Sequence, residues 1–295
     1  MTALACPVCE KTAFRVYLEG EGEALDSSAI GPSRKLTSPG RIVRCSECDF
    51  GFRQSRFTEQ HLANIYRNMD PKLYEVELSG RRKTAARHLK IVRGYVREGR
   101  ILDVGCASGT FLSLAADAGF EPTGAEPSET LSRQAEATLG ARGRVFSSTL
   151  EAAAMQPAYF DAVTLWDVLE HVPNPVAMLE KCRSLLKHGG YLFLNVPDLD
   201  SFEARLLKHR WPLLLAEHLN YFNRPSLRLC GEKSGLRLIR FGRRAAFFSA
   251  RYLFYRLSQH SLPGARLAYR IAQSPVGRLL IPVSLGETYA VWRNA

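Results

Sequence analysis

A buried strand that runs directly into a glycine-containing turn, and then into a helix, constrains the fold of this chain more than any other segment. Residues 100–112 read Arg-Ile-Leu-Asp-Val-Gly-Cys-Ala-Ser-Gly-Thr-Phe-Leu. The next strand-like run, over 120–126, ends on an acidic residue, Glu126. This order is typical of the first half of a doubly wound nucleotide-binding fold, in which the turn admits the ligand and a carboxylate about 20 residues later binds ribose hydroxyls.

The spacing of the glycines argues against a dinucleotide ligand. A dinucleotide site uses G-x-G-x-x-G, in which the middle glycine lets the backbone approach a pyrophosphate. Here Cys-Ala-Ser separates Gly105 from Gly109, and Asp103 at the strand end favours a cation over a phosphate. S-Adenosylmethionine (SAM) has no phosphate and carries an ammonium and a sulfonium, so it fits this turn better.

Four segments in a fixed order resemble the motifs of class I SAM-dependent methyltransferases. They are residues 102–109, 124–128, 160–175 and 185–197. Ala107 stands where the family usually has a third glycine. The resemblance covers residues 74–241, with a last strand near the C-terminus. It implies an α/β fold with a Rossmann-like, doubly wound sheet, and SAM as the cofactor.

The resemblance also implies which residues line the cofactor site. Glu126 would accept hydrogen bonds from both ribose hydroxyls, and Asp103 would order the turn or interact with the amino end of SAM. Leu150 and Glu151 match the family position that flanks adenine. The full set expected to contact SAM is Asp103, Gly105, Ala107, Gly109, Glu126, Pro127, Leu150, Glu151 and Trp166.

Four of the seven cysteines form two C-x2-C pairs near the N-terminus. These are Cys6, Cys9, Cys45 and Cys48. Each pair has the spacing that lets two thiolates reach one tetrahedral zinc ion. Disulfides are disfavoured because the chain shows no secretion signal. We therefore expect a zinc ribbon over 1–56 whose structural Zn²⁺ is covered by Phe50 and Phe52, with no part in catalysis.

Strands and helices alternate along the rest of the chain, which favours a mostly parallel sheet with helices on both faces. We expect helices over 57–98 that cap the cofactor pocket, and a methyltransferase domain over 99–295 with a basic, aromatic insertion at 243–285. Strands are expected at 14–18, 101–104, 121–125, 144–146, 162–165, 191–196, 236–241 and 288–292, and helices at 58–66, 74–96, 110–118, 129–139, 176–186 and 225–234.

Two segments with adjacent Glu and His residues are the candidates for acceptor chemistry. Asp167, Glu170 and His171 resemble the acidic-x-x-Glu-His segment of ubiquinone-pathway O-methyltransferases, where it can hold a divalent cation. A structural role is favoured here over a metal. Glu217 and His218 resemble the Glu-His-x-x-Tyr-Phe segment of zinc-containing deoxysugar C-methyltransferases, in which acid and imidazole lie beside the acceptor.

Histidine suits the removal of a proton from an oxygen or carbon nucleophile, because its unperturbed pKa is near 6.5. The catalytic residues expected are therefore His218, Glu217 and His171. The alternative, that His218 only fixes a lid by hydrogen bonds, stays open. The remaining histidines have no such neighbours in the sequence and are expected at the surface; they are His61, His88, His188, His209 and His260.

The chain is basic, with 40 Lys and Arg against 29 Asp and Glu, a formal net charge of +11. Most of the excess lies in residues 224–295, which leaves open a peripheral contact with an anionic membrane or a phosphorylated substrate. Nucleic acid is disfavoured because aromatic-basic RNA signatures are lacking. The absence of a signal or a long apolar run favours a cytoplasmic enzyme.

These observations together favour methyl transfer from SAM to an oxygen or carbon centre of a small molecule, such as a sugar, polyketide, quinone or lipid-linked intermediate. N-methylation of nucleobases is disfavoured, since the Asn/Asp-Pro-Pro-aromatic sequence is absent after the fourth strand. One alternative is an RNA or protein methyltransferase that uses the ribbon for recognition. Another is a noncatalytic SAM-binding scaffold, although the intact Gly105, Gly109 and Glu126 argue against it.

Overall fold

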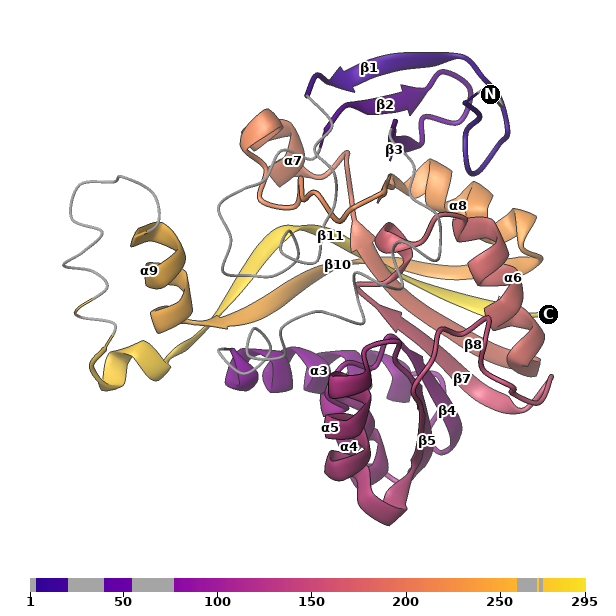
Figure 1. Cartoon of the computed structure of the whole chain (residues 1–295), viewed down its shortest axis with the longest axis vertical. Helices are drawn as coiled ribbons and strands as arrows, with labels where there is room; N and C mark the ends of the chain where they lie inside the picture. The colour runs from indigo at the N-terminus through magenta and orange to yellow at the C-terminus, as the bar shows by residue number, and fades with distance from the viewer. Residues whose placement is uncertain (1–3, 21–39, 55–76, 259–269, 271–272) are drawn as a thin grey trace.

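The computed structural model describes residues 4–20, 40–54, 77–258, 270 and 273–295 (Figure 1). The helix expected at 58–66 and the start of that expected at 74–96 lie outside these residues. Within them the strands form two sheets, one with seven strands and one with four. No helix of the described part is long and apolar enough to cross a bilayer.

The seven-stranded sheet has the order β10-β11-β8-β7-β4-β5-β6. Its strands are β4 (Gly99–Val104), β5 (Phe120–Ala125), β6 (Arg144–Phe146), β7 (Phe160–Trp166), β8 (Leu186–Pro197), β10 (Leu236–Ser249) and β11 (Leu280–Asn294). Strands β4 to β8 pair in parallel, whereas β11 is antiparallel to both of its neighbours. The chain moves outward from β4 through β5 to β6 and then returns to place β7 on the other side of β4. In such sheets, ligands bind at the carboxyl ends of the strands beside this reversal.

Helices cover both faces of this sheet. They are α3 (Leu78–Arg93), α4 (Thr110–Asp117), α5 (Glu129–Leu139), α6 (Pro175–Leu185) and α8 (Arg224–Lys233). Helices α3, α4 and α5 lie on one face and α6 and α8 on the other (Figure 1). Local capping fixes where several helices begin: the side chains of Ser128 and Asn174 each accept a backbone N–H of the first turn. Asn223 and Ser226 form a reciprocal capping box at α8.

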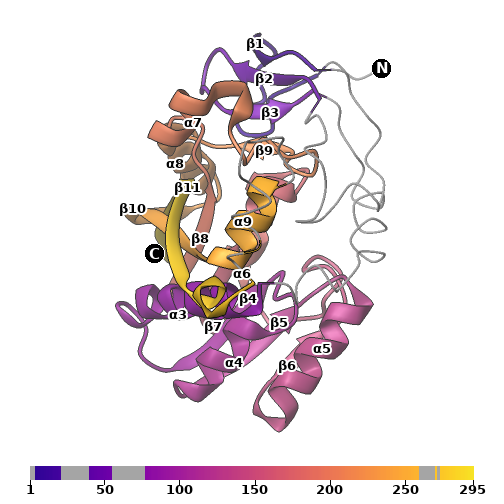
Figure 2. The same cartoon turned by 90° about the vertical axis from the view of Figure 1, so that its left-hand side faces the viewer.

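The four-stranded sheet has the order β1-β2-β3-β9 and lies at one end of the molecule (Figure 2). Its first three strands come from the cysteine-containing N-terminal region: β1 (Phe14–Leu18), β2 (Ile42–Cys45) and β3 (Gly51–Arg53). The fourth, β9 (Asn220–Tyr221), follows the predicted catalytic residue His218. The two sheets are thus joined by a strand from the methyltransferase part of the chain.

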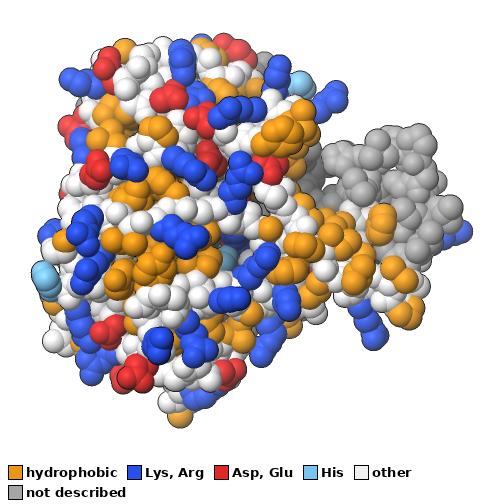
Figure 3. Space-filling view, turned by 180° about the vertical axis from the view of Figure 1, so that it is seen from behind, with side chains coloured by type: hydrophobic (Ala, Val, Ile, Leu, Met, Phe, Trp, Pro, Cys, Tyr) orange, Lys and Arg blue, Asp and Glu red, His pale blue; other side chains and the backbone are white. Residues whose placement is uncertain are grey.

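Strands β10 and β11 are much longer than expected. Their antiparallel register runs from the Leu236–Asn294 pair to the Ser249–Leu280 pair, so both strands continue past the sheet as an arm (Figure 1). The short helix α9 (Ala250–Ser258) lies at the end of this arm. On the face shown in Figure 3, Lys and Arg side chains are distributed over the whole surface, with fewer acidic side chains among them.

Candidate active site

The turn after β4 has the backbone conformation that its glycines predict. Gly105, Ala107 and Gly109 all have positive φ, at 70°, 46° and 78°. A Cβ on Gly105 would lie 2.7 Å from Val168 Cγ2, so this turn also packs directly against the loop after β7. Ala107 adopts the left-handed conformation that costs a residue with a Cβ about 1 kcal/mol or more. The turn thus keeps its conformation although Ala107 stands where the family usually has a third glycine.

Glu126 lies beneath this turn, at the end of β5, with 5% of its surface exposed. One carboxylate oxygen accepts the backbone N–H of Ala107 at 3.0 Å, and the other accepts that of Ser128 at 2.9 Å. Burial raises the pKa of Glu126, and the two backbone hydrogen bonds oppose that shift. Each oxygen keeps a second lone pair, so the carboxylate can also accept a pair of hydroxyls.

Asp103 is the second buried carboxylate of the turn. It accepts a hydrogen bond from Thr164 Oγ1 at 2.6 Å. Burial raises the pKa of Asp103 to about 7, and nearby Glu126 adds to the shift while the Thr164 hydrogen bond opposes it. A cation beside this carboxylate would favour its ionised form. The site is therefore suited to a ligand that carries positive charge, as SAM does.

The other predicted cofactor contacts stand at the strand ends but differ in exposure. Leu150 is buried, Pro127 is half-buried and Glu151 is exposed. Trp166, the last residue of β7, stacks on His88 of α3 with ring centroids 3.9 Å apart and an interplanar angle of 15°. This stacking joins α3 to the end of β7.

The expectation that His88 lies at the surface is wrong. Its side chain is 4% exposed, because it stands on the face of α3 that packs toward the sheet. Its Nε2 accepts a hydrogen bond from Arg244 Nε at 3.0 Å. The pKa of His88 lies well below its usual value, mainly because the side chain is buried. The positive charge of Arg244 lowers this pKa further. His188 and His209 are exposed as expected, while His61 and His260 lie outside the described residues.

Arg244 joins the end of β7 to the two long strands. Its guanidinium forms ion pairs with Asp167, at 2.8 Å, and with Glu287. Asn195 Nδ2 donates to the same two carboxylates. Sequence reasoning missed this network, since Arg244 belongs to a region read as a basic insertion and its partners are far away in sequence. Arg244 and Asn195 thus hold the Asp167 carboxylate by direct contacts.

The predicted catalytic histidines lie together. His171 and His218 have ring centroids 4.8 Å apart, at 76° to each other. Ligand atoms of Glu170, His171 and His218 all lie within 4.8 Å of one another. The expected grouping of Asp167 with Glu170 and His171 is thus replaced by one in which His218 takes the place of Asp167. This cluster of a carboxyl and two imidazoles could share one acceptor proton, and its donor set also fits a divalent cation.

Backbone carbonyls fix the tautomers of both imidazoles. His171 Nδ1 lies 3.0 Å from the carbonyl oxygen of Glu217, and His218 Nδ1 lies 2.9 Å from that of Leu213. A carbonyl only accepts, so each Nδ1 donates and each Nε2 carries the lone pair. Glu217 takes part here through its backbone, and its side chain is half-buried.

Burial determines the charge of this cluster. It lowers the pKa of His218 well below the usual value, with His171 as the second cause, and it lowers the pKa of His171 as well. Burial likewise raises the pKa of Glu170 well above its usual value, and Asp167 reinforces the shift. Glu170 is 2% exposed, and its Oε2 has no hydrogen-bond partner among the described residues. Burial thus favours the uncharged form of all three groups, and an uncharged imidazole is the form that accepts a proton.

The four N-terminal cysteines converge on one point. Cys6 Sγ lies 3.6 Å from Cys48 Sγ, and Cys9 Sγ lies 3.4 Å from Cys45 Sγ. All four sulfur atoms lie within 4.8 Å of one another. Four thiolates at about 2.3 Å from a tetrahedral zinc ion would stand about 3.8 Å apart. The cluster is therefore compatible with Zn²⁺, and the separations are too long for disulfides.

The order of the large sheet, the glycine turn and the carboxylate at the end of β5 define the class I methyltransferase fold. A family model described as "Methyltransferase domain" matches residues 78–240, more than half of the sequence. The chain belongs to this family.

Curated relatives match a shorter stretch. Ubiquinone biosynthesis O-methyltransferase of Xanthomonas campestris pv. campestris is 42% identical over 101 residues, which cover 32% of this chain and 42% of that protein. The enzyme of the same name from Nitrosospira multiformis is 36% identical over 99 residues, or 32% of this chain and 41% of that protein. The chain thus spans less than half the length of the curated relatives that it matches.

Solved structures share the fold at low sequence identity. A SAM-dependent methyltransferase of Thermotoga maritima, described as a possible histamine N-methyltransferase, has a TM-score of 0.53 and 19% identity, with 80% of this chain and all of that one covered. A chain from the complex of the Haloferax volcanii Trm112 methyltransferase activator with a putative methyltransferase has a TM-score of 0.54 and 16% identity, covering 81% and 99%. At these identities the similarity concerns the fold alone.

Proposed function

We propose that this protein transfers the methyl group of SAM to an oxygen or carbon centre of a small-molecule acceptor, and that His218 takes the acceptor's proton. The observation that supports this most is the adjacent His171–His218 pair, whose ring centroids lie 4.8 Å apart and whose Nδ1 atoms both face backbone carbonyls. The relatives named as ubiquinone biosynthesis O-methyltransferases favour an oxygen acceptor such as a phenol. Sugars, polyketides and lipid-linked intermediates are further acceptors with the same requirement.

The residues of the glycine turn would bind and orient the cofactor. Glu126 would hold the ribose hydroxyls, and ionised Asp103 would balance the positive charge at the methionine end. Trp166, stacked on His88, would form the wall at which cofactor and acceptor meet. When bound, SAM would supply a methyl group activated by its positively charged sulfur; the acceptor's lone pair would form the new bond, and the electrons of the broken carbon–sulfur bond would stay on sulfur in neutral S-adenosylhomocysteine.

In this arrangement the acceptor's proton would move to His218. His218 Nε2 would accept it as the new bond to the methyl carbon forms, and the imidazolium would then return it to solvent. The Leu213 carbonyl, which accepts from Nδ1, would stabilise the imidazolium and keep the ring in place. The alternative to this base is a divalent cation held by Glu170, His171 and His218, which would polarise an acceptor oxygen and would occupy the lone pair of His218 Nε2. The four cysteines would hold a structural zinc ion.

The test compares two variants of His218 with a surface control. His218→Ala removes both the base and the Nδ1 hydrogen bond, whereas His218→Asn keeps a donor near the position of Nδ1. Turnover would be measured as S-adenosylhomocysteine formed over a panel of catechols, phenols and nucleotide deoxysugars. We expect turnover with the acceptor found to fall about 100-fold or more in both variants. SAM affinity should stay within about twofold, and His209→Ala should behave as the unchanged protein.

Two results would contradict the proposed role of His218. Full turnover in His218→Asn, with loss only in His218→Ala, would show that the imidazole fixes a lid and is not the base. Full turnover in both variants would exclude both roles. The panel can also fail as a whole, with no acceptor methylated while SAM binds, and that result would support the SAM-binding scaffold.

A further inference from the structure

The N-terminal sheet takes its last strand from the segment that carries His218. Strand β9 pairs antiparallel with β3, Gly51 opposite Tyr221 and Phe52 opposite Asn220. The backbone N–H of Arg53 continues this ladder by donating to the carbonyl of Leu219 at 2.9 Å. The residues immediately after His218 are therefore fixed to the cysteine-bearing sheet by main-chain hydrogen bonds.

Arg53 also fixes the chain on the other side of His218. Its side chain is 2% exposed, and Nη1 donates to the carbonyl of Ala216 at 2.6 Å. One residue thus holds position 219 through its backbone and position 216 through its guanidinium. A long cationic side chain is rarely buried without a specific partner, and here the partner lies two residues before His218.

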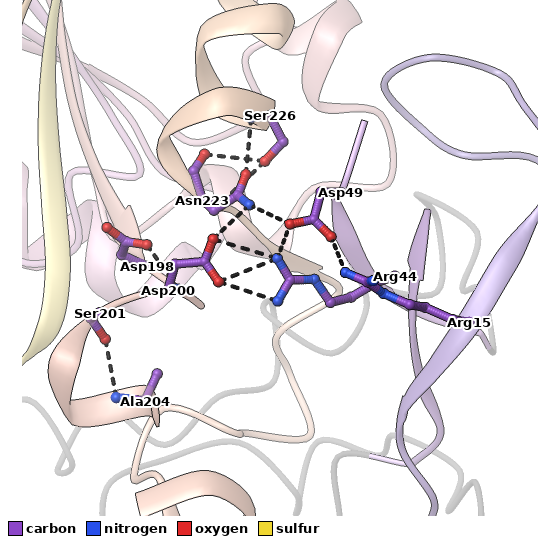
Figure 4. Close-up of polar contacts among 9 residues, drawn as sticks. All are labelled: Arg15, Arg44, Asp49, Asp198, Asp200, Ser201, Ala204, Asn223 and Ser226. Atoms are coloured by element: carbon purple, nitrogen blue, oxygen red, sulfur yellow. Dashed lines mark hydrogen bonds and ion pairs between the residues drawn. The ribbon is translucent and has the colours of Figure 1, made fainter. Parts of the chain in front are cut away.

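Charged contacts extend this interface toward α8 (Figure 4). Buried Arg44 of β2 forms ion pairs with Asp49 and, at 3.2 Å, with Asp200. The side-chain amide of Asn223 donates to the same two carboxylates, at 3.0 Å to Asp49 and 2.9 Å to Asp200. Asn223 is also the N-cap residue of α8. These contacts therefore connect the ribbon to the start of α8, a short distance after His218 in the sequence.

The apolar core is continuous across the same boundary. Phe50 packs edge-on against Phe222 with ring centroids 5.0 Å apart. Both belong to one buried cluster that contains Cys6, Cys45 and Leu169. Leu169 precedes Glu170, whose carbonyl accepts the backbone N–H of Leu219 at 2.8 Å. The cysteine cluster and the histidine cluster are thus two ends of a single packed unit.

We propose that the cysteine ribbon is the scaffold that holds His218 in the acceptor site, with Arg53 as the positioning residue. This inference rests on the function proposed above, in which His218 acts on the acceptor. In this inference the ribbon positions a residue of the active site and is not a separate recognition module. The cofactor half of the site is built from the turns after β4 and β5, which hydrogen-bond to each other through Gly105, Ala107 and Glu126, so we expect the two halves to separate experimentally.

The test uses Arg53→Met, which keeps the apolar stem and removes the guanidinium, with Arg53→Lys as the conservative variant. Arg41→Met is the matched control, because Arg41 directly precedes β2 of the same ribbon and pairs with Glu19 at the surface. The first readout is hydrogen–deuterium exchange of residues 214–223. We expect at least tenfold faster exchange there in Arg53→Met and after removal of zinc, and no change over 99–126.

The second readout is the imidazole of His218, since a merely structural role of Arg53 would not alter it. The proton on Nδ1 donates to the Leu213 carbonyl and should give a slowly exchanging signal in nitrogen-edited NMR spectra. Arg53→Met should lose this signal, and Arg53→Lys should restore it in part because an ammonium can also donate to the Ala216 carbonyl. Affinity for S-adenosylhomocysteine should stay within about twofold in all variants.

The inference is overturned if 214–223 keeps its protection, and His218 its Nδ1 signal, after the ribbon has lost zinc and exchanges freely. It is also overturned if Arg41→Met has the same effect as Arg53→Met. These readouts do not require turnover. Loss of protection in Arg53→Met together with full turnover in His218→Asn would support the scaffold contacts and count against the proposed function alone.

Discussion

The assignment of Glu126 leads to a prediction whose size follows from its contacts. Glu126→Ala should weaken binding of SAM and of S-adenosylhomocysteine, because hydrogen bonds to a charged group contribute about 1.5 to 3 kcal/mol. At 1.4 kcal/mol per tenfold change, this loss corresponds to a dissociation constant about 10 to 150 times larger. The backbone N–H groups of Ala107 and Ser128 also lose their acceptor, so the turn itself should become less ordered.

Glu126→Gln separates these two effects. A glutamine oxygen can still accept from the N–H of Ser128, but its NH₂ group would face the N–H of Ala107, donor against donor. We therefore expect affinity in this variant to lie between those of the unchanged protein and Glu126→Ala. The control is Glu129→Ala, which removes an exposed carboxylate that pairs only with Arg133 in the same helix.

Affinities would be measured by isothermal titration calorimetry at low temperature, after circular dichroism has shown that each variant is folded. The control should bind within about twofold of the unchanged protein. Unchanged affinity in folded Glu126→Ala would refute the assignment of this carboxylate to the ribose.

Three further predictions concern the metal and two buried charges. Freshly purified protein should contain one zinc ion per chain by elemental analysis, and Cys45→Ser should lose it, since a four-thiolate site requires all its ligands. Asp103 has a folded-state pKa of about 7 against an ordinary 3.8, so it contributes stability at low pH that is lost as pH rises through 7. Urea unfolding should therefore show the unchanged protein losing about 3 kcal/mol more than Asp103→Asn between pH 5 and 8. Arg244→Gln should lower the free energy of unfolding by about 3 to 5 kcal/mol, because the buried carboxylate of Glu287 would lose its cation; a change under 1 kcal/mol would contradict this account.

Local signals predicted most of the large sheet. The strand over 144–146 and the helix over 129–139 have the bounds expected from the alternation of strands and helices along the chain. The class I methyltransferase fold is confirmed by the family match and by the order of the strands. The other three cysteines are buried in the core; they are Cys106, Cys182 and Cys230.

Features that depend on distant parts of the chain could not be predicted in the same way. Arg244 finds Asp167 and Glu287 only after β10 and β11 have paired, and nothing in its local sequence distinguishes it from exposed Arg243. Strand β9 is two residues long and has no periodicity that could identify it. The long strands were also underestimated, because arginine-rich stretches lack the simple alternation of a half-buried strand. For the candidate acceptor site, the sequence named Glu170, His171 and His218 in two separate segments, but it could not show that the three side chains meet, because the two Glu-His pairs are far apart in the sequence.

The pairing of β3 with β9 has a consequence for the order in which the protein can fold as it is made. Strand β3 ends at Arg53 and its partner ends at Tyr221, so the ribosome must add 168 residues before the N-terminal sheet can close. At 5 to 20 residues per second this takes roughly 10 to 30 s. During that interval β3 presents an open edge able to pair with another chain. The cysteine-bearing sheet, although its first three strands are made before the methyltransferase domain, is completed only after most of that domain has been synthesised.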